Sequence, residues 1–297
     1  MIGPVADWVV PEQLAATADD EASALHGWYV ELPDIVAGLT RRWQLRLEPP
    51  FQPGGRCSWV APGVGPTGRA VVLKVGWRHP ESVGEADGLN AWAGRGAVRL
   101  YDTWTFGQTD ALLLERCEPG TPLRDALTEP AQDEVVAGLL RRLWRAPPPS
   151  TIPTLTSMCA EWAAEFEARD RTESAARLPA DVAAEGIDLL RSLPTNASDH
   201  VLLCTDGHAG NVVAAQREPW LVIDPKPHVG DPTYDVLQHV LNCRDRLVAD
   251  PRALVRRMAA LLEVDPDRAL LWLFARAVQE SVDAPWLADV ALRVRPA

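Results

Sequence analysis

The stretch that decides the fold reads Cys204-Thr205-Asp206-Gly207-His208-Ala209-Gly210-Asn211, and Val222-Ile223-Asp224 follows shortly after it. Three short apolar segments around it predict β-strands, at 201–203, 212–214 and 220–223. Asp206 and Asn211 then lie in the loop after the first strand, and a hairpin of the other two strands would return Asp224 to the same place. Carboxylate and amide oxygens suit a hard cation, so the pattern predicts a magnesium site.

The spacing from Asp206 to Asn211 is that of the kinase catalytic loop, D-x-x-x-x-N. In phosphoryl transfer such an aspartate orients the acceptor hydroxyl and takes its proton, and the asparagine gives an uncharged oxygen to magnesium. We therefore predict Asp206 as the catalytic base and Asn211 and Asp224 as metal ligands. The alternative is that Asp206 and Asn211 are turn residues and that Asp224 caps the chain before a proline.

A lysine ends another apolar run, because Lys74 follows Val71-Val72-Leu73 in a pattern similar to the V-A-I-K strand of kinases. A lysine on such a strand can reach the α- and β-phosphates of a nucleotide. Glu85 lies in a helix predicted over residues 80–93, with Pro80 in its first turn, and is placed to pair with Lys74. The alternative is an edge-strand lysine that discourages aggregation, with a solvated glutamate.

Two further segments of the N-terminal part are candidates for nucleotide contact. Gly54-Gly55-Arg56-Cys57-Ser58 departs from G-x-G-x-x-G, yet its amides and the Ser58 hydroxyl suit phosphate, and an ordinary hairpin turn explains its glycines equally. A strand predicted at 111–116 leads into Glu118-Pro119-Gly120, a strong breaker. In a kinase-like fold the backbone near Glu115 and Cys117 would meet the adenine edge.

The order of predicted elements divides the chain near residues 117–121. Residues 1–30 are expected to form a short arm or helix, and an amphipathic helix is predicted at 32–45. Strands are expected at 57–60, 70–75, 97–101 and 111–116. After the breaker, helices are expected at 130–145, 156–170, 179–193, 231–243, 251–263 and 266–282. This order indicates an α+β, two-lobed arrangement.

The composition of the 297-residue chain fits a globular protein, with 47% apolar and 24% charged residues. Its net charge of −12 argues against a nucleic-acid partner, because an acidic chain repels phosphate backbones. No apolar run is long enough to cross a bilayer, and the N-terminus lacks a signal-peptide pattern. The cysteines are far apart and are expected to be reduced thiols in a cytoplasmic protein: Cys57, Cys117, Cys159, Cys204 and Cys243.

Two reactive residue types lie beside the predicted catalytic residues. His208 is expected to support the loop structurally, and a role as metal ligand or base is the alternative. Cys204 lacks the partners of a thiol nucleophile and is expected to be buried.

Two motifs in the C-terminal part are quite specific, W-L-V-I-D-P at 220–225 and G-D-P-x-Y-D at 230–235. With residues 70–75, 92–100, 112–120 and 206–211, they resemble the aminoglycoside phosphotransferase family, above all its streptomycin 6-phosphotransferase and hydroxyurea phosphotransferase branch. The resemblance implies a protein-kinase-like fold with a β-rich N-terminal lobe and a mainly helical C-terminal lobe. It also implies Asp206 as base, Asn211 and Asp224 on magnesium, and Lys74 on the nucleotide phosphates.

The same resemblance implies an acceptor site lined by C-terminal helices, with Glu280 and Asp283 as acidic candidates. The alternative is that both belong to a solvated helix end. The chain departs from the family at one place, where the usual H-G-D reads Cys204-Thr205-Asp206. Because the histidine mainly braces the loop, this departure bears on rate or loop geometry more than on the type of reaction.

Together these inferences predict a cytoplasmic, Mg-ATP-dependent O-phosphotransferase for a small hydroxyl compound, either a streptomycin-like aminoglycoside or aminocyclitol antibiotic or hydroxyurea. GTP is the alternative donor, and a monomer or weak dimer without nucleic-acid or membrane partners is expected. Residues 1–118 would form the nucleotide-binding lobe with a helical extension, and residues 119–297 the helical lobe with the catalytic loop and acceptor site. The alternatives are a metabolic sugar or amino-sugar kinase and a catalytically weak, nucleotide-binding pseudokinase.

Overall fold

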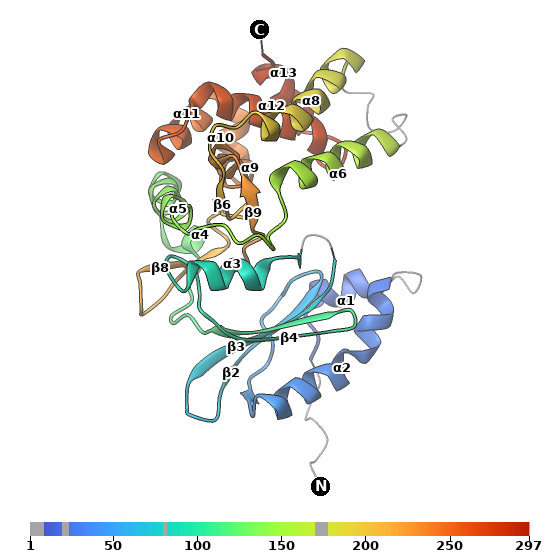
Figure 1. Ribbon diagram of the computed structural model, residues 1–297, viewed down its shortest axis with the longest axis vertical. Helices are drawn as coiled ribbons and strands as arrows, with labels where there is room; N and C mark the ends of the chain where they lie inside the picture. The colour runs from blue at the N-terminus through green and yellow to red at the C-terminus, as the bar shows by residue number, and fades with distance from the viewer. Residues whose placement is uncertain (1–8, 20–23, 80–81, 170–177, 297) are drawn as a thin grey trace. The chain divides into compact units, whose positions relative to one another are not determined.

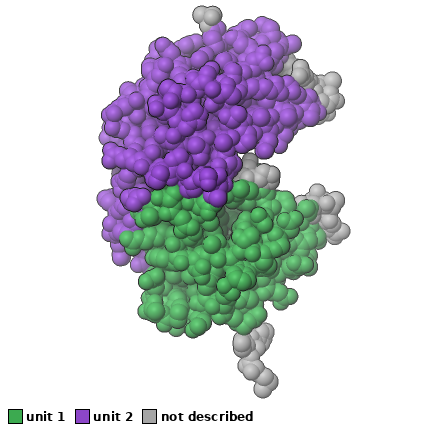
Figure 2. All heavy atoms as spheres, in the orientation of Figure 1, with its two compact units in different colours: residues 1–94, 98–117 green, residues 95–97, 118–297 purple. Residues whose placement is uncertain are grey.

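The computed structural model describes residues 9–19, 24–79, 82–169 and 178–296. The chain divides into two compact units, coloured separately in Figure 2. The first comprises residues 1–94 and 98–117, and the second comprises residues 95–97 and 118–297. The three-residue segment 95–97 therefore belongs to the second unit although it lies between two parts of the first.

The first unit is built on a five-stranded antiparallel sheet with the strand order β1-β2-β3-β5-β4 (Figure 1). Its strands are β1 (Arg46–Leu47), β2 (Ser58–Val64), β3 (Ala70–Trp77), β4 (Leu100–Phe106) and β5 (Thr109–Glu115). The strands predicted at 57–60, 70–75 and 111–116 are confirmed. The strand predicted at 97–101 instead begins at Leu100 and runs to Phe106, because β4 is a mostly exposed edge strand without the apolar run of a buried one.

Alternation along β3 gives the sheet two different faces. Val71, Leu73 and Val75 are buried in a core shared with helices α1 (Glu12–Ala18) and α2 (Ala24–Arg42). Lys74 therefore points to the opposite face. The helix predicted at 32–45 is α2, which begins earlier because Leu25 and Trp28 continue its buried face.

The helix predicted at 80–93 is α3 (Glu85–Trp92). Pro80 and Glu81 lie outside the described residues. Gly84 precedes the helix with a φ of 93°, a left-handed conformation that favours glycine. Because this turn starts α3 at Glu85, the glutamate occupies the first turn.

The second unit is mainly helical, and α12 lies at its centre. From Ala269 to Val278 nearly every side chain of α12 is buried, and the helix packs against α8, α11 and α13. The helices are α4 (Leu123–Ala126), α5 (Glu129–Leu143), α6 (Leu155–Ala168), α8 (Ala180–Ser192), α9 (Val236–Asn242), α10 (Arg244–Ala249), α11 (Pro251–Leu262), α12 (Pro266–Glu280) and α13 (Leu287–Val294).

Most of the predicted helices of this unit are confirmed, with ends that differ by a few residues. The helix predicted at 231–243 is divided, because Asp231 caps a 3-10 turn at Pro232–Asp235 before α9 begins. The short helices α4, α10 and α13 were not predicted, since four to eight residues are too few to show a clear helical period.

Four short strands in this unit carry the predicted catalytic segment. They are β6 (Val201–Leu203), β7 (Val212–Ala214), β8 (Trp220–Val222) and β9 (His228–Gly230). The hairpin of β7 and β8 is confirmed. β6 pairs instead with β9, which was not predicted because Pro225 and Pro227 just before it mask a three-residue strand.

The segment 95–97 completes the edge of β8. The amide of Val222 donates a hydrogen bond to the carbonyl of Gly96 at 2.9 Å. Ala97 forms a parallel bridge with Val222, and its carbonyl accepts a hydrogen bond from Arg217 Nη2 at 3.1 Å. These contacts attach residues 95–97 to the hairpin that leads into Asp224.

Candidate active site

The loop between β6 and β7 brings the predicted catalytic segment together. The amide of Ile223 donates to the carbonyl of Asn211 at 2.8 Å, which extends the β7–β8 hairpin by one step. Asn211 and Ile223 are therefore opposite each other, and Asp224 comes next with a left-handed φ of 51°. Asp206, Asn211 and Asp224 thus meet at one end of this hairpin.

The side chain of Asn211 is oriented by Asp206. Its Nδ2 donates to Asp206 Oδ2 at 3.0 Å and to the Asp206 carbonyl at 3.2 Å. Both partners are acceptors, so the amide nitrogen must face them and Oδ1 must point elsewhere. The orientation leaves the amide oxygen of Asn211 directed away from Asp206, and an amide oxygen and a carboxylate are donors suited to a hard cation.

His208 supports the loop from inside. Its Nδ1 accepts a hydrogen bond from the Gly210 amide at 3.0 Å, so the ring proton belongs on Nε2, which lies 3.8 Å from Asp206 Oδ1. Burial lowers the pKa of His208, and the negative charge of Asp206 only partly opposes this. A neutral histidine that caps the loop fits its predicted structural role.

Asp235 braces the start of the same loop from the 3-10 turn. Its Oδ1 accepts from the Thr205 amide at 2.8 Å, and its Oδ2 accepts from the Cys204 amide at 3.1 Å. The Oδ2 atom also accepts from Trp144 Nε1 at 2.7 Å. Asp235 is 2% exposed, and burial raises its pKa to about 6 despite these three donors.

Thr205 and Lys226 form the second brace. The Thr205 hydroxyl donates to the carbonyl of Lys226, and the Lys226 amide donates to the Cys204 carbonyl at 3.1 Å. Thr205 also has a left-handed φ of 50°. Cys204-Thr205 therefore holds the loop through its backbone and a hydroxyl, where a histidine was expected from the family pattern.

Cys204 is fully buried, as expected, and burial raises the pKa of its thiol well above the usual value. The nearby carboxylates of Asp235 and Asp206 act in the same direction. A thiol held in its neutral form is a poor nucleophile. The structure therefore places Cys204 among the packing residues of the loop.

In the first unit, the ion pair expected between Lys74 and Glu85 is present. Lys74 Nζ lies 2.8 Å from Glu85 Oε1 and 2.6 Å from Oε2, and the two side chains are 14% and 11% exposed. Lys74 sits in the middle of the sheet between β2 and β5. An edge-strand lysine is thereby excluded, and the pair fixes the direction of the ammonium group.

Three other nucleotide candidates lie in the same unit. Ser58 begins β2, at the end of the connection from β1, and its Oγ lies 2.9 Å from the position that a Cβ on Gly55 would take. Cys117 is half-buried just after β5. The Glu115 amide donates to the Arg99 carbonyl at 2.9 Å, so a contact of this backbone with adenine would use its other groups.

Both acidic acceptor-site candidates are already in ion pairs within the second unit. Glu280 pairs with the buried Arg276, whose guanidinium lies 4.0 Å from the ring centre of Trp162. Asp283 is paired at 2.8 Å with Arg169. The side chain of Glu280 is 31% exposed and that of Asp283 is 70% exposed, so the alternative of a solvated helix end fits Asp283 better than Glu280. A cationic acceptor would have to compete with an arginine at each.

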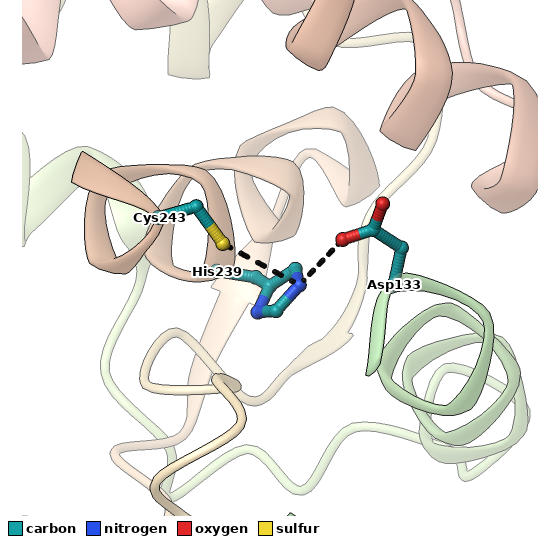
Figure 3. A group of neighbouring side chains, drawn as sticks. All are labelled: Asp133, His239 and Cys243. Carbon is teal, nitrogen blue, oxygen red and sulfur yellow. Dashed lines mark hydrogen bonds and ion pairs between the residues drawn. The ribbon is translucent and has the colours of Figure 1, made fainter. Parts of the chain in front are cut away.

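Another group of ligating side chains consists of Asp133 on α5, His239 on α9 and Cys243 just after α9 (Figure 3). The contacts of Asp133 show that this group is part of a cluster of ion pairs between side chains. Asp133 Oδ1 lies 3.0 Å from His239 Nε2 and 2.9 Å from Arg246 Nη1. Its Oδ2 accepts from Arg246 Nη2 at 2.8 Å and Arg257 Nε at 2.7 Å. Two guanidinium groups already neutralise the carboxylate, so a metal ion there would meet like charges.

The bracing residues Asp235 and Lys226 were absent from the predicted site. Asp235 ends the motif G-D-P-x-Y-D and Lys226 directly follows W-L-V-I-D-P, and these motifs served only to indicate the family. Asp231, in the second motif, is also buried, and its Oδ2 accepts from Arg268 and Trp272, each at 2.6 Å. The signal available in the sequence was the charged residue within or directly after each of these motifs.

Comparisons with known sequences find relatives over most of this chain. The family model described as aminoglycoside/hydroxyurea antibiotic resistance kinase matches residues 42–290. A streptomycin 6-kinase of Streptomyces glaucescens is 33% identical over 282 residues, which cover 92% of this chain and 90% of that protein. A hydroxyurea phosphotransferase of Kitasatospora aureofaciens is 35% identical over 292 residues, which cover 96% and 83%.

Solved structures agree on the fold at low sequence identity. Choline kinase LicA from Streptococcus pneumoniae aligns with a TM-score of 0.61 at 11% identity, covering 89% of this chain and 97% of that one. Macrolide 2'-phosphotransferase MphH from Brachybacterium faecium aligns with a TM-score of 0.56 at 14% identity, covering 89% and 98%. The predicted protein-kinase-like fold is confirmed.

Proposed function

Because this chain belongs to the aminoglycoside/hydroxyurea antibiotic resistance kinase family and is thus a small-molecule phosphotransferase with a hydroxyl acceptor, we propose that it uses Mg-ATP to phosphorylate a streptomycin-like antibiotic or hydroxyurea. The observation that carries the proposal is the hydrogen bond from Asn211 Nδ2 to Asp206 Oδ2, at the end of the hairpin that leads into Asp224. This is the arrangement that phosphoryl transfer needs for its base and its metal ligands.

In the proposed reaction, Asp206 accepts the proton of the acceptor hydroxyl. The acceptor oxygen forms a bond to the γ-phosphorus, the bond from that phosphorus to the bridging oxygen breaks, and ADP leaves with the electron pair. Asp206 is 13% exposed at its side chain and is held by Asn211 and the bracing of its loop. It is therefore oriented before the acceptor arrives, which lowers the entropic part of the barrier.

The metal ligands are proposed on the chemistry of their donor atoms. Asn211 Oδ1 and the Asp224 carboxylate offer one neutral and one charged oxygen, and magnesium usually completes its shell with phosphate and water. When bound, the ion would neutralise charge on the β- and γ-phosphates.

Nucleotide contacts are proposed for the first unit. Lys74, directed by Glu85, would bind the α- and β-phosphates. Ser58 would add a hydroxyl, and the chain from Glu115 to Cys117 would meet the base through groups other than the Glu115 amide. Residues 1–118 would thus serve the nucleotide, and residues 119–297 would carry the catalytic loop and the acceptor site.

The acceptor site is proposed at Glu280 and Asp283. A guanidinium-bearing antibiotic would replace an internal guanidinium on each carboxylate, since Arg276 and Arg169 now hold them. ATP is the proposed donor with GTP as the alternative, and we expect a monomer or weak dimer in the cytoplasm. No helix among the described residues is long and apolar enough to span a membrane.

The test is phosphate transfer from ATP and GTP to streptomycin, other aminoglycosides, hydroxyurea and amino sugars, with products identified by mass spectrometry. Turnover on an antibiotic or hydroxyurea is expected. Turnover only on an amino sugar would favour the metabolic kinase. Nucleotide-dependent stabilisation without turnover on any acceptor would favour the pseudokinase.

A matched pair of variants tests the base. Asp206→Asn is expected to lower kcat by roughly 10²–10⁴-fold, the usual worth of a general base. Asp199→Asn removes an exposed carboxylate just before β6 and is expected to keep wild-type turnover. Full turnover by Asp206→Asn would refute its assignment as base.

A further inference from the structure

We propose that Lys226 is a second catalytic cation, whose ammonium group contacts the transferring phosphoryl oxygens beside Asp206. The inference rests on the proposed phosphotransfer and adds a residue that neither the motif spacing nor the family resemblance assigned. It is carried by two independent observations, the distribution of lysines in the sequence and the position of Lys226 on the catalytic loop.

Lysine is almost absent from this chain. Of the 29 lysine and arginine residues, only Lys74 and Lys226 are lysines, and the other 27 are arginines. Structural ion pairs such as those of Asp133 and Asp231 are made with arginine. A lysine ammonium group therefore occurs at only two positions. The first, Lys74, is the lysine proposed to hold nucleotide phosphates. Ammonium and guanidinium are not interchangeable where a point charge is needed.

The backbone of Lys226 is fixed to the loop that carries Asp206. Its amide donates to the Cys204 carbonyl at 3.1 Å, and its carbonyl accepts from the Thr205 hydroxyl. Prolines on both sides, Pro225 and Pro227, restrict the chain further. Lys226 also lies two residues after Asp224, so one rigid segment carries both the proposed metal ligand and this lysine.

The side chain of Lys226 reaches the catalytic carboxylate. Its Nζ lies 3.9 Å from Asp206 Oδ2, the same oxygen that accepts from Asn211 at 3.0 Å. A separation of 3.9 Å is an ion pair without a direct hydrogen bond. The Lys226 side chain is 39% exposed, against 13% for Asp206. A group that binds at Asp206 from solvent would thus meet this ammonium.

The chemistry needs a positive charge at this point. As the acceptor oxygen bonds to phosphorus and the bridging bond to ADP breaks, negative charge spreads over the three outer oxygens of the phosphoryl group. The acceptor proton passes to Asp206, and Lys226 keeps its own protons throughout. A fixed ammonium next to the base would stabilise those oxygens more in the transition state than in the ground state, which raises kcat.

The scarcity of lysine allows a direct test by chemical labelling. An ATP derivative with an acyl group on its γ-phosphate transfers that acyl group to a nearby amine, forming an amide and releasing ATP. Besides Lys74 and Lys226, the only other amine in the chain is the N-terminus. Peptide mapping after labelling is expected to find acylated Lys226, and excess Mg-ATP is expected to protect it.

The outcomes separate this inference from the proposed function. Protected labelling of Lys226 supports the inference even before an acceptor is known. Labelling of Lys74 alone overturns it and leaves nucleotide binding intact. Absence of protected labelling at both lysines overturns the proposed function itself.

Kinetics on an accepted substrate give the second test. Lys226→Met is expected to lower kcat by about 100-fold with the KM for ATP changed by less than about threefold, because the contact belongs to the transition state. Lys226→Arg is expected to recover part of this loss. Arg145→Met, which removes an exposed arginine, is the matched control. If Lys226→Met keeps kcat within threefold of wild type, the inference is wrong.

Discussion

Two buried aspartates of the second unit, Asp133 and Asp235, differ in the kind of donor that their carboxylates accept hydrogen bonds from. Asp133 is 0% exposed and Asp235 is 2% exposed, so both carboxylates are removed from water. Asp133 receives two arginines and a histidine. Asp235 receives only neutral donors, one indole and two backbone amides.

The pKa values of the two carboxyl groups are shifted in opposite directions. Burial alone would raise the pKa of Asp133, but hydrogen bonds from His239, Arg246 and Arg257 more than reverse it and hold the pKa far below the usual range. Burial raises the pKa of Asp235 to about 6, and its neutral donors offset only part of the increase. Asp133 therefore stays ionised and holds neighbouring helices together through ion pairs. Burial disfavours the ionised form of Asp235, and its hydrogen bonds fix the direction of the loop backbone at Cys204 and Thr205.

The largest expected effect comes from breaking the charged cluster. Asp133→Ala leaves Arg246 and Arg257 without their buried partner, which should lower the free energy of unfolding by about 3 kcal/mol. The estimate lies at the lower end of the usual range because these arginines are 26% and 39% exposed. Urea unfolding measures it, with Glu161→Gln, a change at an exposed glutamate of α6, as control. A change under 1 kcal/mol, the size of a surface pair, would contradict the comparison.

The next effect comes from the neutral brace. In Asp235→Asn the new amide nitrogen must face N–H donors, so at least one of them loses its acceptor. We expect a loss of roughly 2 kcal/mol in unfolding free energy and a fall in kcat, because the loop that carries Asp206 loosens. Asp133→Ala should spare kcat per folded molecule by comparison. Equal kcat losses in the two variants would remove the distinction.

The two aspartates also predict opposite dependence on pH. A folded pKa near 6, above that of the unfolded chain, means that stability from Asp235 is present below about pH 4 and is lost as the pH rises through 6. Wild type should therefore lose roughly 2 kcal/mol relative to Asp235→Asn between pH 4 and pH 7. Asp133 contributes stability above its unfolded pKa, which is lost only in stronger acid. A constant difference between the two proteins over this range would contradict the raised pKa.

The smallest effect should come from one neutral donor. Trp144→Phe removes the indole N–H from Asp235 and keeps most of the ring packing. We expect a loss of about 1 kcal/mol in unfolding free energy and a further rise in the pKa of Asp235, since that hydrogen bond lowers it. Titration by NMR compares the variant with wild type. A fall in the pKa would show that the indole does not favour the charged carboxylate.

What could be predicted from sequence was local in the chain. Asp206 and Asn211 share one loop, and Lys74 and Glu85 follow from strand alternation and the next helix, so spacing indicated them. The braces are not local: Asp235 meets Thr205 across 30 residues, and Asp133 meets Arg246 across 113. One sequence carries no periodic signal for such pairs.

The missed strand β9 has the same explanation at a smaller scale. Its three residues follow two prolines and pair with β6, not with the adjacent hairpin. Only its tertiary pairing with β6, from His228 opposite Leu203 to Gly230 opposite Val201, defines it as a strand. For the acceptor candidate Asp283, the partner Arg169 lies 114 positions away and depends on packing. Arg276, the partner of Glu280, lies four residues earlier on the same helix, so helical spacing could have indicated that pair.

The short segment 95–97 has a consequence for recombination between related genes. The chain passes between the units after residues 94, 97 and 117, so an exchange of gene fragments at residue 117 would give residues 95–97 one ancestry and the hairpin another. The amide of Val222, two residues before Asp224, depends on the Gly96 carbonyl. Working chimaeras should therefore inherit 95–97 and 220–222 from the same parent, although more than a hundred positions separate them.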